Sequence, residues 1–159
     1  MTKVEKTNAM RILDKLGIAY EALAYESDGT AKDGVTVAAL VGEDAQRVYK
    51  TLVTLDEKGA PHVCVLAADR ELDLKAAARH FGVKTLMMEK VKDLKALTGY
   101  VRGGCSPIGM KKPFPTVVDE RAKGLPYVLV SAGKIGLQLK IQPEDVVKAA
   151  GAGYGEISR

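Results

Sequence analysis

The chain has 159 residues, of which 47% are hydrophobic and 28% are charged, with a formal net charge of +4. This length and composition indicate one globular domain over residues 1–159 and exclude a disordered or fibrous protein. Aromatic residues make up 5% and tryptophan is absent, which argues against a platform of exposed rings for single-stranded nucleic acid.

Apolar spacing and turn residues divide the first half of the chain into short elements. Thr7 is a candidate N-cap and Gly17 a candidate C-cap for the first helix. In chain order we expect a helix over 8–16, a strand over 19–25, a polar loop over 26–34, a helix capped by Thr36 and ending at Val41, and two strands within 48–68. The last two strands should form a hairpin around the turn at 56–59.

The second half of the chain mixes helical and strand-like segments in the same way. Asp73 can cap a helix that Gly82 ends, and Pro143 suits the first turn of the last helix. In chain order we expect helices over 74–81 and 89–97, strands within 114–120, 127–133 and 136–141, a helix over 143–151, and a glycine-rich tail. Interspersed helices and short strands favour an α+β domain with a curved, mainly antiparallel sheet.

Neither a membrane location nor a metal centre is expected from the sequence. No apolar run reaches the roughly 20 residues that span a bilayer, and the opening segment MTKVEKTNAM lacks the apolar core of a signal peptide. Cys64 and Cys105 are too few for a disulfide framework and lack the paired spacing of zinc ligands. We therefore expect a cytoplasmic protein with reduced thiols.

A hydrolase triad is also not expected. Only His62 and His80 could supply an imidazole base, and nothing in the sequence aims a serine or cysteine at either. The segment GCSPIG differs from the spacing of a nucleophile elbow, and Pro107 after Ser106 removes the N–H that would complete an oxyanion hole.

Two glycine-containing segments superficially resemble nucleotide-binding loops. SAGKIG (131–136) lacks the first glycine of a P-loop, and Ile135 stands where a hydroxyl would hold magnesium. GAGYG (151–155) follows a predicted helix instead of opening one. We interpret both as turns, and no cofactor is expected.

Two features remain as candidates for function. Lys50 shares one face of its predicted strand with Leu52, so its side chain either enters a lined cavity or extends from an exposed face. Gly103 and Gly104 open the segment GGCSPIGMKKPFPT, where bare backbone permits positive φ and close approach of a substrate to main-chain N–H groups. The alternative for this segment is a surface loop with solvated lysines.

Together, VYKTLV, TGYVRGGCSPIGMKKPFPTVVDE and YVLVSAGKIGLQLKIQPEDVVKAAGA resemble the YbaK/EbsC family of aminoacyl-tRNA editing proteins. Members are relatives of the insertion domain of some bacterial prolyl-tRNA synthetases. The resemblance implies a barrel-like sheet of six or seven strands and is strongest to deacylases that clear cysteine mischarged onto proline tRNA. The implied partners are mischarged aminoacyl-tRNA and, in a transient ternary complex, prolyl-tRNA synthetase.

The resemblance also implies roles for individual residues. Lys50 would contact the substrate near the terminal ribose, phosphate or ester, and the backbone of Gly103 and Gly104 would line the site. Further substrate contacts are implied for Tyr25, Ser106, Pro107 and Gln138, and we expect phosphate contacts from Arg102, Lys111, Lys112 and Lys134. Gln138 stands where some relatives carry a carboxylate, so only a hydrogen-bonding role is expected for it.

The implied reaction needs no nucleophile from the protein. An aminoacyl ester is already activated, and the thiol of a cysteine substrate lies close to its own carbonyl, so correct positioning makes the attack intramolecular. Lysine and backbone N–H groups would stabilise the developing charge, and Cys105 is expected to be structural. Two alternatives stay open: a deacylase for another small aminoacyl group such as alanine, and a non-catalytic module that binds tRNA or a synthetase.

Overall fold

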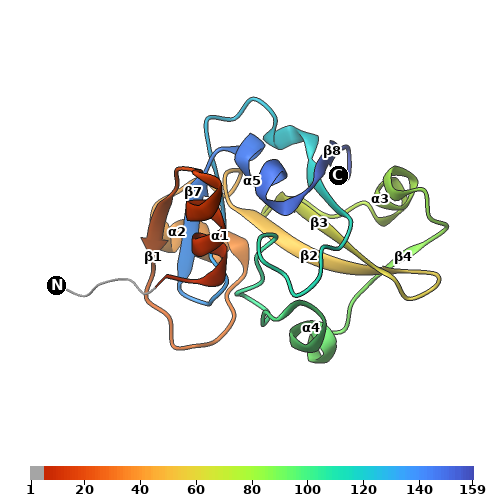
Figure 1. Cartoon of the computed structure of the whole chain (residues 1–159), viewed down its shortest axis with the longest axis horizontal. Helices are drawn as coiled ribbons and strands as arrows, with labels where there is room; N and C mark the ends of the chain where they lie inside the picture. The colour runs from red at the N-terminus through yellow and green to blue at the C-terminus, as the bar shows by residue number, and fades with distance from the viewer. Residues whose placement is uncertain (1–5) are drawn as a thin grey trace.

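Residues 6–159, the part of the chain that this computed structural model describes, contain five α-helices and eight strands. The helices are interspersed among the strands (Figure 1). Residues 1–5, which belong to the predicted 1–159 domain and to the opening segment without signal-peptide character, lie outside the described residues. The helices are α1 (Asn8–Leu16), α2 (Gly34–Val41), α3 (Leu74–Phe81), α4 (Val91–Thr98) and α5 (Pro143–Ala150), with a 3-10 turn at Glu120–Ala122. The strands are β1 (Glu21–Ala24), β2 (Tyr49–Asp56), β3 (Pro61–Ala67), β4 (Leu86–Met88), β5 (Thr116–Asp119), β6 (Val128–Ser131), β7 (Leu137–Ile141) and β8 (Gly153–Gly155).

The strands form two sheets. One is antiparallel with the order β1-β7-β6, and the other has the order β4-β2-β3-β5-β8. In the second sheet β2 pairs antiparallel with β3 and β4, whereas β5 pairs parallel with β3 and β8. A parallel bridge between Val48 and Leu129 joins the two sheets. The predicted α+β class and mainly antiparallel pairing are confirmed, although the strands lie in two joined sheets and do not close into a barrel.

Helix starts follow local side-chain chemistry. The Thr7 hydroxyl and the Asp73 carboxylate each accept a main-chain N–H three residues ahead, as predicted for an N-cap. The expected start of α2 was wrong, because Asp33 caps it and accepts the Thr36 N–H at 2.8 Å. A carboxylate near the positive end of a helix is favourable, which accounts for the earlier start at Gly34.

The two glycine-containing segments differ in outcome. SAGKIG joins β6 to β7 and is the turn that we predicted. The prediction of a turn was wrong for GAGYG, since its last three residues form β8 beside β5, with Tyr154 in register with Val118. The sequence of these three residues does not predict their pairing with β5. The pairing depends on where α5 places the residues that follow it.

The main core lies where α1 and α5 cover the sheets (Figure 1). Leu13 of α1, Val130 of β6 and Leu139 of β7 are fully buried there, together with Val65 of β3. Of the helices within residues 6–159, none is both long and apolar enough to cross a membrane. The core therefore fixes β6 and β7 against β2, and this arrangement positions the site described below.

Replacing Leu139 by alanine should test this core. Leu139 is 0% exposed in the central strand of the three-stranded sheet, so Leu139→Ala should lower the free energy of unfolding by about 2–5 kcal/mol. Leu40→Ala is the control, because Leu40 is 47% exposed and its loss should change stability by only about 0.5 kcal/mol. Urea denaturation measures both, and equal losses would contradict the assignment of the core.

Candidate functional site

A cavity of about 480 Å³ is lined by residues of both sheets, of the start of α2 and of the loop after α4. Four of the expected site residues lie in its wall: Lys50, Arg102, Gly103 and Gln138. They come from β2, the 101–105 loop and β7, which are far apart in the sequence. The fold therefore brings the lysine, one of the two glycines and the glutamine to one hollow.

Lys50 is partly buried in the cavity wall, and its ammonium is held by main-chain carbonyls. Its Nζ donates to the carbonyl oxygen of Arg70 at 2.6 Å and to that of Ala68 at 3.4 Å. Burial lowers the pKa of Lys50 from its ordinary 10.5, and the charges of Asp69 and Glu71 partly oppose this shift. The ammonium thus has a fixed position and is only partly solvated.

The C-terminal residues support the loop that carries these carbonyls. The Arg70 Nε donates to the Ser158 Oγ at 3.0 Å, and the Ser158 hydroxyl donates in turn to the buried carboxylate of Asp119. Glu71 and Arg159 also exchange main-chain hydrogen bonds of 3.2 and 2.9 Å. The segment that binds the Lys50 ammonium is therefore fastened both to β5 and to the end of the chain.

The paired glycines allow one chain segment to approach another closely. Gly103 has φ of 86°, and a Cβ on it would lie 2.9 Å from the Cα and Cβ of Ala31. Gly104 lies outside the cavity wall and donates its N–H to Val101 at 3.0 Å, and its added Cβ would meet Lys134 Cα at 3.0 Å. Of the two glycines, Gly103 is the one with backbone facing the cavity. Among the described residues its N–H has no hydrogen-bond acceptor.

Two buried oxygens in the cavity wall have no hydrogen-bond partner among the described residues. They are the Thr51 Oγ1 and the Oε1 of Gln138, whose residue is only 5% exposed. An unpartnered buried acceptor costs about 1–3 kcal/mol, and a hydrogen-bond donor that reached either oxygen would remove this cost. Sequence reasoning missed Thr51 and also Ser131, another residue of the wall. The available signal for Thr51 was a hydroxyl between Tyr49 and Val53 on the apolar face of β2.

The other expected contacts lie outside the cavity wall. Tyr25 is buried, and its hydroxyl has no partner in the described part of the chain. The Ser106 Oγ accepts the N–H of Ile108 at 3.2 Å, so Ser106 and the buried Pro107 shape the loop itself. The side chains of Lys111, Lys112 and Lys134 are exposed.

Among residues 6–159, no thiol or imidazole is placed to act as a nucleophile or base in the cavity. Cys105 lines the wall, but burial raises the pKa of its thiol to about 12, so it stays protonated near neutral pH. His62 pairs with Asp56 at 3.0 Å near the hairpin turn, away from the residues of the cavity wall. The cavity wall therefore contains a cation, the backbone of Gly103 and hydrogen-bond acceptors, which are groups suited to binding a polar substrate.

Comparisons with known proteins identify a family of similar sequences. The model of the aminoacyl-tRNA editing domain family matches residues 29–149. EbsC of Enterococcus faecalis, a candidate Cys-tRNA(Pro)/Cys-tRNA(Cys) deacylase, is 41% identical over 154 residues, which are 97% of this chain and 94% of that protein. A proline–tRNA ligase of Lactobacillus delbrueckii subsp. bulgaricus is 27% identical over 94 residues, 59% of this chain and 17% of the ligase.

The fold also matches a solved structure. The crystal structure of a candidate trans-editing enzyme for prolyl-tRNA synthetase superimposes with a TM-score of 0.82 at 23% identity. The match covers 98% of this chain and 99% of the other. At this identity the superposition shows a shared fold.

The lowered pKa of Lys50 predicts a pH-dependent stability. Between the lowered pKa and 10.5 the unfolded chain binds more protons than the folded chain, so the free energy of unfolding contributed by Lys50 rises with pH in this window. The stability of the wild type relative to Lys50→Met should therefore increase as the pH rises from the lowered pKa of Lys50 toward 10.5. Urea denaturation of both proteins measures this difference, and a constant value would show that Lys50 ionises like a solvated lysine.

Proposed function

The chain belongs to the family of aminoacyl-tRNA editing domains, and we propose that it is a deacylase that clears cysteine mischarged onto proline tRNA. The observation that carries this proposal is the cavity in which the Lys50 ammonium and the Gly103 backbone lie with two unpartnered acceptors. Identity of 41% over almost the whole length of EbsC supports the same substrate.

The size of the cavity fits the charged end of a tRNA. At about 480 Å³ it is within the range of roughly 300–1,000 Å³ that is usual for small-molecule sites. It can accept an aminoacyl group with its terminal nucleoside, whereas the duplex of the tRNA must stay outside. The reacting ester would then lie beside Lys50.

The polar groups of the cavity correspond to groups of an aminoacyl ester. The α-ammonium of the amino acid donates hydrogen bonds, and the Thr51 Oγ1 and the Gln138 Oε1 are acceptors without partners in the described chain. The ester oxygen gains negative charge during cleavage, and the Lys50 ammonium and the Gly103 N–H can stabilise it. The acceptors orient the substrate, and the cation and the N–H assist the reaction.

The nucleophile in this proposal is the thiol of the substrate. Since the Cys105 thiol is held protonated by burial, it is a poor nucleophile, in keeping with the structural role expected for it. The thiol of a cysteinyl ester held in a bent conformation can attack its own carbonyl carbon. A C–S bond forms and the C–O bond of the ester breaks, so cysteine leaves as a cyclic thioester. The thiol proton passes to the ribose oxygen, which is released as the tRNA hydroxyl. Proline has no such group, so correctly charged tRNA is spared.

Selection of the tRNA is proposed to involve prolyl-tRNA synthetase. The similarity to a proline–tRNA ligase over 94 residues supports a functional relation between the two proteins. We propose a transient ternary complex of this protein, the synthetase and the mischarged tRNA. Such a complex would form in the cytoplasm, where translation takes place.

The first test replaces the cavity lysine. Lys50→Ala should lower the rate of Cys-tRNA(Pro) deacylation by roughly a hundredfold or more, because the developing charge loses its fixed cation. Lys58→Ala, at the exposed hairpin turn, is the control and should keep the wild-type rate. Release of labelled amino acid in single-turnover reactions measures both variants.

In the same assay, comparing aminoacyl-tRNA substrates distinguishes thiol-assisted cleavage from other deacylation reactions. The wild type should clear Cys-tRNA(Pro) on the order of a hundredfold faster than Ser-tRNA or Ala-tRNA(Pro), since only cysteine carries an internal thiol. Equal rates for cysteine and serine would exclude the thiol-assisted mechanism. A higher rate for alanine would identify a different editing enzyme.

The second test removes an unpartnered acceptor without changing side-chain volume much. Thr51→Val should keep or slightly raise the melting temperature, because a buried hydroxyl without a partner is lost. The same variant should deacylate Cys-tRNA(Pro) roughly tenfold or more slowly, because a hydrogen bond to the charged α-ammonium is removed. A loss of stability with unchanged activity would show that Thr51 has only a packing role.

A further inference from the structure

The positive charge of the chain is concentrated in one segment. Residues 90–112 contain six lysine and arginine residues and one carboxylate, a net charge of +5, whereas the whole chain carries +4. The remaining residues therefore sum to −1. A concentration of this kind is typical of a surface that meets an anionic partner, and it is not explained by the cavity alone.

Five lysines of this segment form a surface that we call the α4 basic surface: Lys90, Lys92, Lys95, Lys111 and Lys112. All five are exposed. In the described part of the chain none of them forms an ion pair within 4.0 Å, although ion pairs are found for lysines elsewhere. Asp93 is the one carboxylate within residues 90–112, so the segment keeps a net positive charge, and an anionic ligand would reduce the remaining repulsion.

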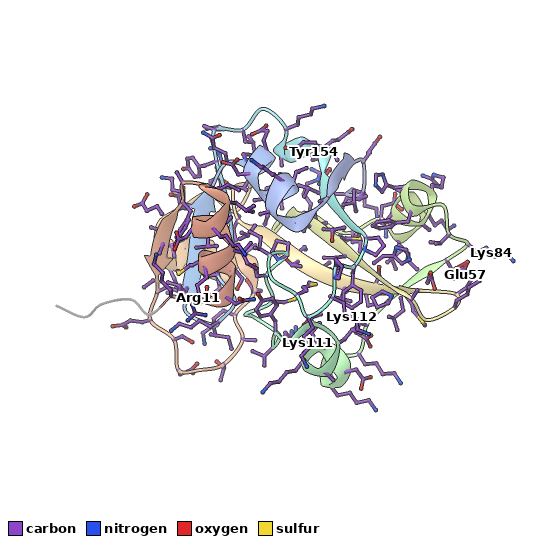
Figure 2. All side chains as sticks on the ribbon, in the orientation of Figure 1. Arg11, Glu57, Lys84, Lys111, Lys112 and Tyr154 are labelled. Carbon is purple, nitrogen blue, oxygen red and sulfur yellow. The ribbon has the colours of Figure 1, made fainter. Side chains whose placement is uncertain are left out.

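The α4 basic surface is continuous because the 110–112 loop is fastened to α4. The Lys111 N–H donates to Thr98 at 3.0 Å, and the Lys111 Nζ donates to the carbonyl of Ala96 at 3.4 Å. Figure 2 shows Lys111 and Lys112 beside α4. Lysines separated by almost twenty residues in the sequence thus lie on one side of the molecule.

This surface begins at the edge of the cavity. Leu94, on α4 between Lys92 and Lys95, is part of the cavity wall, and so is the exposed Arg102. A molecule whose end occupies the cavity must therefore leave it close to these side chains.

We propose that the α4 basic surface binds the phosphate backbone of the acceptor stem of the tRNA whose 3′ end occupies the cavity. This inference rests on the proposed function. It adds a second surface of the protein that binds the same tRNA. Flexible, exposed lysines bind phosphates as point charges and carry no base specificity. The α4 basic surface is defined by lysines alone and includes no aromatic side chain that could stack on a base, so the contact is with the phosphate backbone.

The test measures the binding of uncharged tRNA(Pro) over a series of salt concentrations. In the variant Lys90→Gln/Lys92→Gln/Lys95→Gln the affinity should fall roughly a hundredfold at about 0.15 M salt, if each lysine neutralises one phosphate. The slope of log affinity against log salt should become less steep by about 3. Glutamine is chosen because it keeps the helix propensity of the exposed positions.

The control is Lys15→Gln/Lys75→Gln/Lys148→Gln, which removes the same charge from exposed positions of α1, α3 and α5. Its affinity should stay within about threefold of the wild type, because these lysines lie on other helices. An equal loss in both triple variants, or no loss in the α4 variant, would overturn the proposal. Loss of synthetase binding with unchanged tRNA binding would also overturn it and would assign the surface to a protein partner.

A minimal substrate separates this inference from the proposed function. A short oligonucleotide that ends in CCA and carries cysteine has no acceptor stem, so the α4 variant should deacylate it at the wild-type rate. Slower deacylation of this substrate by the α4 variant alone would contradict a role limited to the stem. If the wild type bound tRNA with the expected salt dependence but deacylated neither substrate, the proposed function would fail while the surface remained.

Discussion

The position of one ammonium group, that of Lys50, is the constraint on which the chemistry of the cavity depends. A partly buried cation is costly unless it has partners, and here two main-chain carbonyls supply them. Carbonyl dipoles fix the ammonium without neutralising it, whereas an ion pair with a carboxylate would cancel most of its field. Asp69 and Glu71 act on it only through longer-range attraction. The charge is therefore positioned in advance and still available to a substrate oxygen.

The other groups of the site are present because distant chain segments approach Lys50 closely. Gly103 permits the loop that contains Ala31 to lie against the cavity, and Gln138 reaches the same wall from β7. Thr51 follows Lys50 directly in β2, so a single strand presents both a cation and an acceptor to the cavity. In the proposed reaction the protein contributes fixed polar groups and the substrate carries its own reactive group. This division of roles agrees with a sequence that predicts no catalytic triad.

Local features were predictable from the sequence, and features that depend on distant pairing were not. The caps Thr7 and Asp73 and the hairpin after β2 were correct because each depends on a few neighbouring residues. β4 and β8 were missed because three residues carry no usable periodicity, and both exist only beside longer strands.

The site shows the same division. Strand alternation and the bare backbone of the glycine segment made Lys50 and Gly103 candidates before the family resemblance was considered. The resemblance added Gln138, and all three residues line the cavity. Strand alternation places Thr51 on the face opposite Lys50, so its presence in the cavity wall depends on β6 packing against β2. Arg70 and Ser158 are 88 residues apart, so the support of the Lys50 loop could not be read from local sequence.

This separation also has a consequence for biosynthesis. At about 5–20 residues per second, the ribosome takes roughly 4–18 seconds to add Ser158 after Arg70. During this interval the nascent chain contains Lys50 without the Arg70–Ser158 hydrogen bond that supports its partners. The proposed deacylase site is therefore among the last parts of the domain to mature.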